Sequence, residues 1–269
     1  MTRITTIFLA GTFSVLMWLK NNRASLISMI VWPYLMSFTI MFLGTVLGNP
    51  STFATRMGID NPFLYVLAGG GVAISCLAVV DSVANSVVFH RWLGTLQYLL
   101  LTPVATYVVL LIEPLPGALI TSTIPLLSIV PGAIVFGGVA AALRVIAALA
   151  FVYLAMIPLA GFSVILATIS LMMRQEGHGL SFVTPAMLLL SGVFYPVSAL
   201  PKVLQVLSWF IPPRYAVEAT RIIVSISHPE IRPVVMCVLA IASLSILYNT
   251  ISIPMLRAVD RWIKRCGAV

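Results

Sequence analysis

Charged residues are scarce in this chain of 269 residues, because Asp, Glu, Lys and Arg together make up 8% of it. A soluble domain is about 25% charged and about 45–50% apolar, whereas 61% of this sequence is hydrophobic and its mean hydropathy is +1.11. A water-soluble fold of this size could not cover its surface with so few charges. The composition therefore excludes a soluble globular domain and predicts an all-α membrane protein.

Residues that could carry enzyme chemistry or hold a metal are also missing. The three cysteines, Cys76, Cys237 and Cys266, have no metal-ligand spacing, and the seven acidic residues form no carboxylate pair within one apolar run. No lysine follows a glycine, which excludes a Walker A loop, and no histidine begins the His-Glu-x-x-His helix of a zinc protease. We therefore expect no catalytic residue, no metal site and no cofactor site in this chain.

Basic residues outnumber acidic ones and give the chain a net charge of +8. They lie mainly at the ends of apolar runs, where topology and lipid headgroups explain them better than a nucleic-acid partner does. With six spans and an inner N-terminus, nine of the fifteen fall inside: Arg3, Lys20, Arg23, Arg91, Arg174, Arg257, Arg261, Lys264 and Arg265. This bias predicts a multi-pass protein of the plasma membrane with both termini in the cytoplasm.

Six apolar runs predict the membrane-spanning helices. They are Ser25–Leu47, Phe63–Phe89, Gly117–Val135, Val145–Met173, Leu180–Val197 and Pro233–Met255. Residues 1–24 should form a retained interfacial helix, because the apolar run Ile4–Leu19 has no signal-peptide cleavage site after it. Residues 25–255 would then be a six-helix bundle within one transmembrane domain, and residues 256–269 a cytoplasmic tail. A short re-entrant piece at Val104–Ile112 is an alternative.

Two acids near the inner ends of apolar runs leave two interpretations open. Asp81 lies about 27 Å along the second predicted helix, so it could be solvated at the interface or act as a proton-relay carboxylate. Glu113 precedes Pro114, where an acid could offset the dipole at the start of a helix or serve in transport.

The segment Ser198–Arg221 carries too many charges for lipid and too much apolar surface for a free loop. Its prolines predict two short helices that dip into the protein from outside, because irregular backbone persists only where protein or water covers it. Arg214, Glu218 and Arg221 should lie together near water, since Glu218 is four residues after one arginine and three before the other.

Three motifs occur in order along the chain. The first is Gly94-Thr95-Leu96-Gln97-Tyr98-Leu99-Leu100-Leu101-Thr102-Pro103, within the short segment Phe89–Pro103. The second is Ser191-Gly192-Val193-Phe194-Tyr195-Pro196, which continues to Leu200-Pro201, and the third is Pro213-Arg214-Tyr215-Ala216-Val217-Glu218-Ala219-Thr220-Arg221. Together they resemble the type-2 permease family of ABC exporters, over nearly the whole chain. The acidic residues usual around the family's first motif are replaced here by Phe89-His90-Arg91-Trp92 and by Gln97.

The resemblance implies a membrane subunit of an ATP-binding-cassette exporter, with a coupling helix inside and a re-entrant hairpin outside. The coupling interface would comprise His90, Arg91, Trp92, Leu93, Gly94, Thr95, Leu96, Gln97 and Tyr98. The outer gate would comprise Ser191, Gly192, Phe194, Tyr195, Pro196, Leu200, Pro201, Arg214, Glu218 and Arg221. Trp92 and Tyr98 are suitable anchors for a groove on a soluble partner.

The resemblance also implies the partners. Two separate ATPase subunits would bind ATP and Mg and hydrolyse ATP, while a second permease, identical or related, would complete the path within membrane lipid. Ser191-Gly192 is more similar to the drug and lipo-oligosaccharide branch, so we expect a hydrophobic or amphipathic small molecule, a lipid or a lipo-oligosaccharide. The alternatives are a polysaccharide-exporting permease, an ion-driven secondary transporter that uses Asp81 or Glu113, and a membrane scaffold that transports nothing.

Overall fold

The computed structural model describes residues 3–47, 61–94, 108–109, 112–172, 178–193, 195, 197–225 and 230–266. Within these ranges no strand occurs, and the helices are α1 (Arg3–Asn21), α2 (Arg23–Leu47), α4 (Pro62–Trp92), α7 (Leu115–Ser128), α8 (Val130–Met172), α9 (His178–Leu190), α10 (Lys202–Ser208), α11 (Pro212–Ser225) and α12 (Ile231–Cys266), with one 3-10 turn, η1 (Val197–Ala199). Five of them, α1, α2, α4, α8 and α12, are long and apolar enough to cross a membrane. The expected all-α membrane protein is confirmed.

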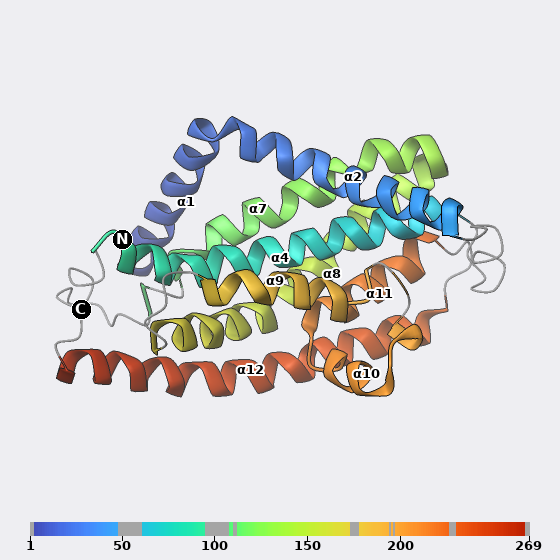
Figure 1. The fold of residues 1–269 in the computed structure, drawn as a ribbon. Helices are drawn as coiled ribbons and strands as arrows, with labels where there is room; N and C mark the ends of the chain where they lie inside the picture. The colour runs from blue at the N-terminus through green and yellow to red at the C-terminus, as the bar shows by residue number, and fades with distance from the viewer. Residues whose placement is uncertain are drawn as a thin grey trace.

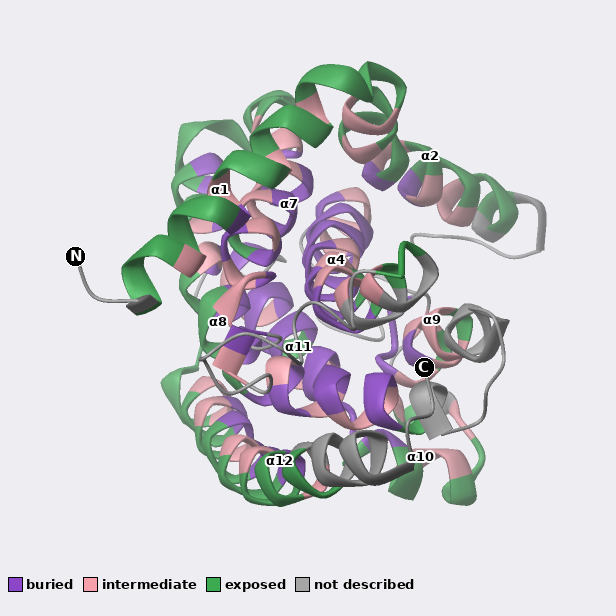
Figure 2. Ribbon diagram, turned by 90° about the vertical axis from the view of Figure 1, so that its left-hand side faces the viewer, coloured by how far each residue is buried: buried purple, intermediate pink, exposed green. Residues whose placement is uncertain are grey.

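The helices α2, α4, α8 and α12 run lengthwise along the bundle, whereas α1 is steeply inclined to this direction (Figure 1). The start of α1 and the end of α12 lie at the same end of the bundle, which we call the proximal end, and α10 lies toward the opposite, distal end (Figure 1). Seen along this direction, buried α4 stands in the centre, while α1, α2 and α12 turn exposed faces outward (Figure 2). The exposed side chains include Phe13, at 64%, and Phe38, at 69%, which suits helices that face lipid.

Glycines allow α4 to be the central helix. Gly69, Gly70 and Gly71 follow one another on α4, and most of its spanning stretch is buried. A Cβ on Gly71 would lie 2.8 Å from Cδ1 of Ile129, and one on Gly70 would lie 3.7 Å from Oγ of Ser37. Small residues of this kind let neighbouring helices approach closely, which is the main source of packing energy within lipid.

The third and fourth predicted spans are not separated by a loop, as was expected. We expected Gly117–Val135 and Val145–Met173 to be separate, but α8 runs from Val130 to Met172 and is divided only at Gly138, whose φ of 74° and ψ of −176° interrupt the helix. Glycine adopts this backbone without the strain that a Cβ would bring. Arg144, which directly precedes the predicted fourth span, lies within the helix that follows this break.

A small break also separates α7 from α8, and a tyrosine from α2 compensates for it. The hydroxyl of Tyr34 donates to the carbonyl of Ser128 at 2.6 Å and accepts from the amide of Gly132 at 3.2 Å. Backbone groups freed at a helix break must find partners when no water is near. One side chain therefore bridges the third predicted span, which continues from α7 into the start of α8.

One predicted boundary was wrong, and two predicted spans belong to longer helices. The fifth span ends at Leu190 instead of Val197. The helix of the second span continues beyond Phe89, so that His90, Arg91 and Trp92 form the last turn of α4 rather than a separate segment. The apolar part of α12 ends at Met255, where the sixth span was predicted to end, and the helix continues as far as Cys266 with an amphipathic pattern. The alternative re-entrant piece at Val104–Ile112 lies mostly outside the described residues.

Candidate functional site

The distal turn after α9 depends on a glycine. The amide of Ser191 donates to the carbonyl of Met187 at 2.8 Å, which completes the last turn of α9, and Gly192 then takes a φ of 73°. A Cβ on Gly192 would lie 2.6 Å from Cγ2 of Val197 in η1. Both the left-handed backbone and the close approach therefore require glycine, which ends the helix and reverses the chain.

Side chains near the turn after α9 and on α10 donate hydrogen bonds to backbone carbonyls close to them in sequence. Gln205 on α10 donates from Nε2 to the carbonyls of Leu200 at 2.7 Å and Ser198 at 3.1 Å. The hydroxyl of Tyr195 donates to the carbonyl of Leu189 at 3.1 Å. These bonds satisfy backbone acceptors that no regular helix serves, so the segment has a defined conformation.

The two arms of the predicted hairpin differ in their surroundings. On α10, which follows Pro201, the side chains of Val203, Val206 and Leu207 are exposed. In contrast, α11 packs against α4, α8 and α12, and buries side chains such as Ala216. Arg221 on α11 is therefore covered by protein, which explains how this charge is tolerated in an apolar chain, whereas Glu218 stays half exposed.

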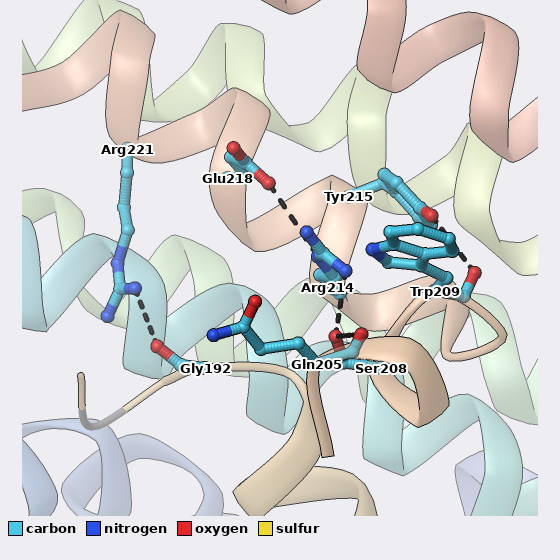
Figure 3. A network of polar contacts seen from close by, with 8 residues as sticks. All are labelled: Gly192, Gln205, Ser208, Trp209, Arg214, Tyr215, Glu218 and Arg221. Atoms are coloured by element: carbon cyan, nitrogen blue, oxygen red, sulfur yellow. Dashed lines mark hydrogen bonds and ion pairs between the residues drawn. The ribbon is translucent and has the colours of Figure 1, made fainter. Parts of the chain in front are cut away.

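Arg221 makes several polar contacts to backbone carbonyls of other segments. Its side chain is 6% exposed, and Nη1 donates to the carbonyl of Gly192 at 2.7 Å (Figure 3). Nη2 donates to the carbonyl of Val193, and Nε donates to the carbonyl of Tyr65 on α4 at 3.3 Å. The guanidinium carbon also lies 4.1 Å from the centre of the Tyr65 ring, within cation–π range. Arg221 thus ties α11 to both α4 and the glycine turn.

The placement of Arg221 near water was therefore wrong. Arg221 points toward Gly192 and away from Arg214 and Glu218 (Figure 3). It fits only because Gly69 leaves room: a Cβ there would lie 2.4 Å from Nε of Arg221. Three backbone carbonyls, none of them readable from local spacing, replace the water that the charge would otherwise need.

Arg214 and Glu218 do form the expected pair one helical turn apart. Nε of Arg214 lies 3.9 Å from Oε2 of Glu218, and Nη1 donates to Oγ of Ser208 on α10 at 2.7 Å (Figure 3). The hydroxyl of Tyr215 donates to the carbonyl of Trp209 at 2.9 Å. These contacts join the two arms. Arg214, Glu218, Arg221 and Gly192 line a cavity of about 360 Å³.

The proximal end of α4 carries the residues expected at a coupling contact. Nε2 of His90 lies 2.8 Å from Oε2 of Glu113, which precedes α7. A Cβ on Gly11 of α1 would lie 2.1 Å from the carbonyl oxygen of Glu113, so α1 crosses directly over this point. Three helices therefore meet around one ion pair, next to the exposed turn at Leu93 and Gly94.

Part of each predicted site lies beyond what the structure describes. Outside the described residues are Thr95, Leu96, Gln97, Tyr98, Phe194 and Pro196. For Arg91 and Trp92 only the backbone is described, in the last turn of α4. The sequence argument missed Tyr65, Gly69, Gln205 and Ser208, although three consecutive glycines in an apolar helix could have indicated a close approach.

A central apolar helix, exposed apolar helices around it and covered charges define an integral membrane protein of the helical class. The chain matches the family described as ABC-2 type transporter over residues 18–224, and it belongs to this family. The resemblance to type-2 permeases is thereby confirmed at the level of the family. A comparison with curated proteins finds no match for the chain.

Proposed function

We propose that this chain is the export-path subunit of an ATP-driven exporter, paired with a second permease and powered by two separate ATPase subunits. Family membership makes the chain a transmembrane subunit of an ABC transporter. Export, the pairing and the cytoplasmic position of the proximal end are our proposals. The substrate we expect is a hydrophobic or amphipathic small molecule, a lipid or a lipo-oligosaccharide.

The contact between His90 and Glu113 is the observation that carries the proposed coupling. The segment Phe89–Pro103 would dock on the ATPase, and its first residues are the last turn of central α4. The ion pair of 2.8 Å connects that turn to α7, and Gly11 packs α1 against the same point. A push on the docked segment would therefore reach three helices at once, as a shift of packed elements requires.

The turn at Gly192 and the two arms α10 and α11 are the proposed distal gate. Arg221 fastens α11 to α4 through the carbonyl of Tyr65 and to the turn after α9 through the carbonyls of Gly192 and Val193, whereas α10 is held to α11 by more exposed contacts, including Arg214 with Ser208. This difference supports a gate in which η1 and α10 move while α11 and the turn at Gly192 stay with α4 and α8. The predicted role of Leu200 fits this division, since its carbonyl binds Gln205 of the moving arm.

The ion-driven alternative has less support than the ATP-driven one. Glu113 already has His90 as a partner, and the family to which the chain belongs consists of ABC transporter subunits.

A substitution in the proposed coupling segment tests this function. In the purified complex, Leu96→Asp should abolish substrate-stimulated ATP hydrolysis and weaken binding of the ATPase subunit, because an unpaired charge would be buried in an apolar groove. Ile231→Asp is the matched control, since Ile231 is 77% exposed at the first residue of α12, beside exposed Glu230 and outside the proposed gate, and should tolerate the charge. The proposal fails if Leu96→Asp assembles and hydrolyses ATP like the control.

A further inference from the structure

A second cavity, larger than the distal one, lies in the proximal half of the bundle. Its volume is about 770 Å³, and α1, α2, α4, α7 and α9 all contribute to its wall. This size is within the range of about 300–1,000 Å³ that is typical of sites for small organic molecules. Much of the wall is apolar and aromatic, with exposed side chains of Trp18, Trp32 and Phe89.

Asp81 lies in the wall of this cavity and is its distinctive charge. It is on α4, about 29 Å from the start of the helix and about 16 Å before its end, so it belongs to the proximal part of the apolar span. Its side chain is exposed to the cavity, and among the described residues no hydrogen bond or ion pair of Asp81 occurs. Among the residues that the structure describes, neither lysine nor arginine lines the cavity.

The second acid in the wall already has a close polar partner. Glu113 is held by His90 at 2.8 Å, so its carboxylate has a partner that Asp81 lacks. A carboxylate within an apolar span is costly unless a cation or several donors accompany it, and such residues face a functional cavity as a rule. An incoming cation would supply the charge that the wall of this cavity does not.

Neighbouring polar groups extend the site along α4. Asn85 lies one helical turn after Asp81 and is also exposed in the cavity wall. Oγ of Ser86, another wall residue, is buried and has no hydrogen-bond partner within the described structure. Aromatic rings near a carboxylate favour an organic cation, because ring faces attract positive charge while the apolar body of the ligand displaces water.

We propose that this cavity binds a monovalent organic cation with a bulky apolar body, and that Asp81 is the residue that selects for the positive charge. The inference rests on the proposed export function and names the substrate class of that path. A cation of this kind would enter from the proximal side, close to the coupling contact of His90 with Glu113.

Two probes of the same shape and opposite charge test the proposal. Tetraphenylphosphonium and tetraphenylborate would be compared by equilibrium binding to the complex of chain and ATPase in lipid nanodiscs, without nucleotide. We expect the wild-type complex to prefer the cation, and Asp81→Asn to weaken cation binding by roughly tenfold or more while leaving the anion unchanged. Asp81→Glu should keep most of the preference, which guards against a general folding defect.

Glu230→Gln is the control for charge alone, because Glu230 is an exposed acid just before α12 and outside the cavity. Equal binding of the two probes, or an unchanged cation affinity in Asp81→Asn, overturns the inference. ATP-driven transport is measured separately on the same samples. Asp81-dependent binding without ATP-driven export would refute the proposed export function but support the cation site. Export that is unaffected by Asp81→Asn would refute the cation site but support the proposed export function.

Discussion

Arg221, the buried arginine of α11, allows a direct test of how the turn after α9 is held against α11 and α4. Replacing Arg221 by Met keeps much of the side-chain volume but removes the donors to the carbonyls of Gly192, Val193 and Tyr65. The first two belong to buried residues, and each unsatisfied buried carbonyl costs about 1–3 kcal/mol. Losing a desolvated charge offsets part of this cost. We therefore expect Arg221→Met to destabilise the protein by about 2–4 kcal/mol.

The assay is thermal unfolding of the detergent-purified chain, followed by the fraction that stays monodisperse in size-exclusion chromatography. Arg214→Met is the matched control, because Arg214 makes one side-chain hydrogen bond, at 2.7 Å, and one loose ion pair with half-exposed Glu218. That change should cost about 0.5–1.5 kcal/mol. Gly69→Ala tests the same contact from the α4 side, because the Cβ of the new alanine would lie 2.4 Å from Nε of Arg221. If Arg221→Met is as stable as wild type, the three carbonyl contacts do not hold the segment and the reasoning is refuted.

Two further predictions concern the membrane and the gate. Single cysteines at Gly94 and His178 should react with an impermeant reagent only from the cytoplasmic side of sealed cells, and one at Lys202 only from outside; labelling of Gly94 from outside would reverse the topology. Glu218→Ala should leave expression nearly normal, because a half-exposed pair at 3.9 Å contributes about 0–1 kcal/mol, yet it should change the rate of ATP-driven transport if α10 moves against α11. An unchanged transport rate would favour a static plug.

Hydropathy was enough to find the long helices but not the residues at which each of them ends. The spans that became α2 and most of α4 and α12 could be read directly, because about 20 apolar residues suffice to cross the hydrocarbon core. The end of α9 was placed too late, since Val193 continues the apolar run and only the backbone of Gly192 shows the reversal. Composition records how apolar a stretch is, but not where its chain turns.

The prediction that Arg221 lies near water failed for a different reason. Its spacing from Glu218 on one helix suggested a solvated pair, but the true partners come from α4 and from the turn after α9, which lie 156 and 28–29 residues away in sequence. Local rules for side-chain pairs hold for exposed helices and say nothing of acceptors brought in by tertiary packing. Family resemblance drew attention to the segment, yet it carried no information on which charge is buried.

The glycine triplet of α4 has a mechanical consequence. Helix stiffness is lowest where residues lack a Cβ, and three such residues in succession would make an isolated helix prone to bend. In this protein Gly69 is braced by Arg221 of α11, Gly70 faces Ser37 of α2, and Gly71 meets Ile129 between α7 and α8. The neighbouring helices therefore support α4 at its most flexible point, so the helix that withdraws from these glycines would determine the direction in which α4 can bend.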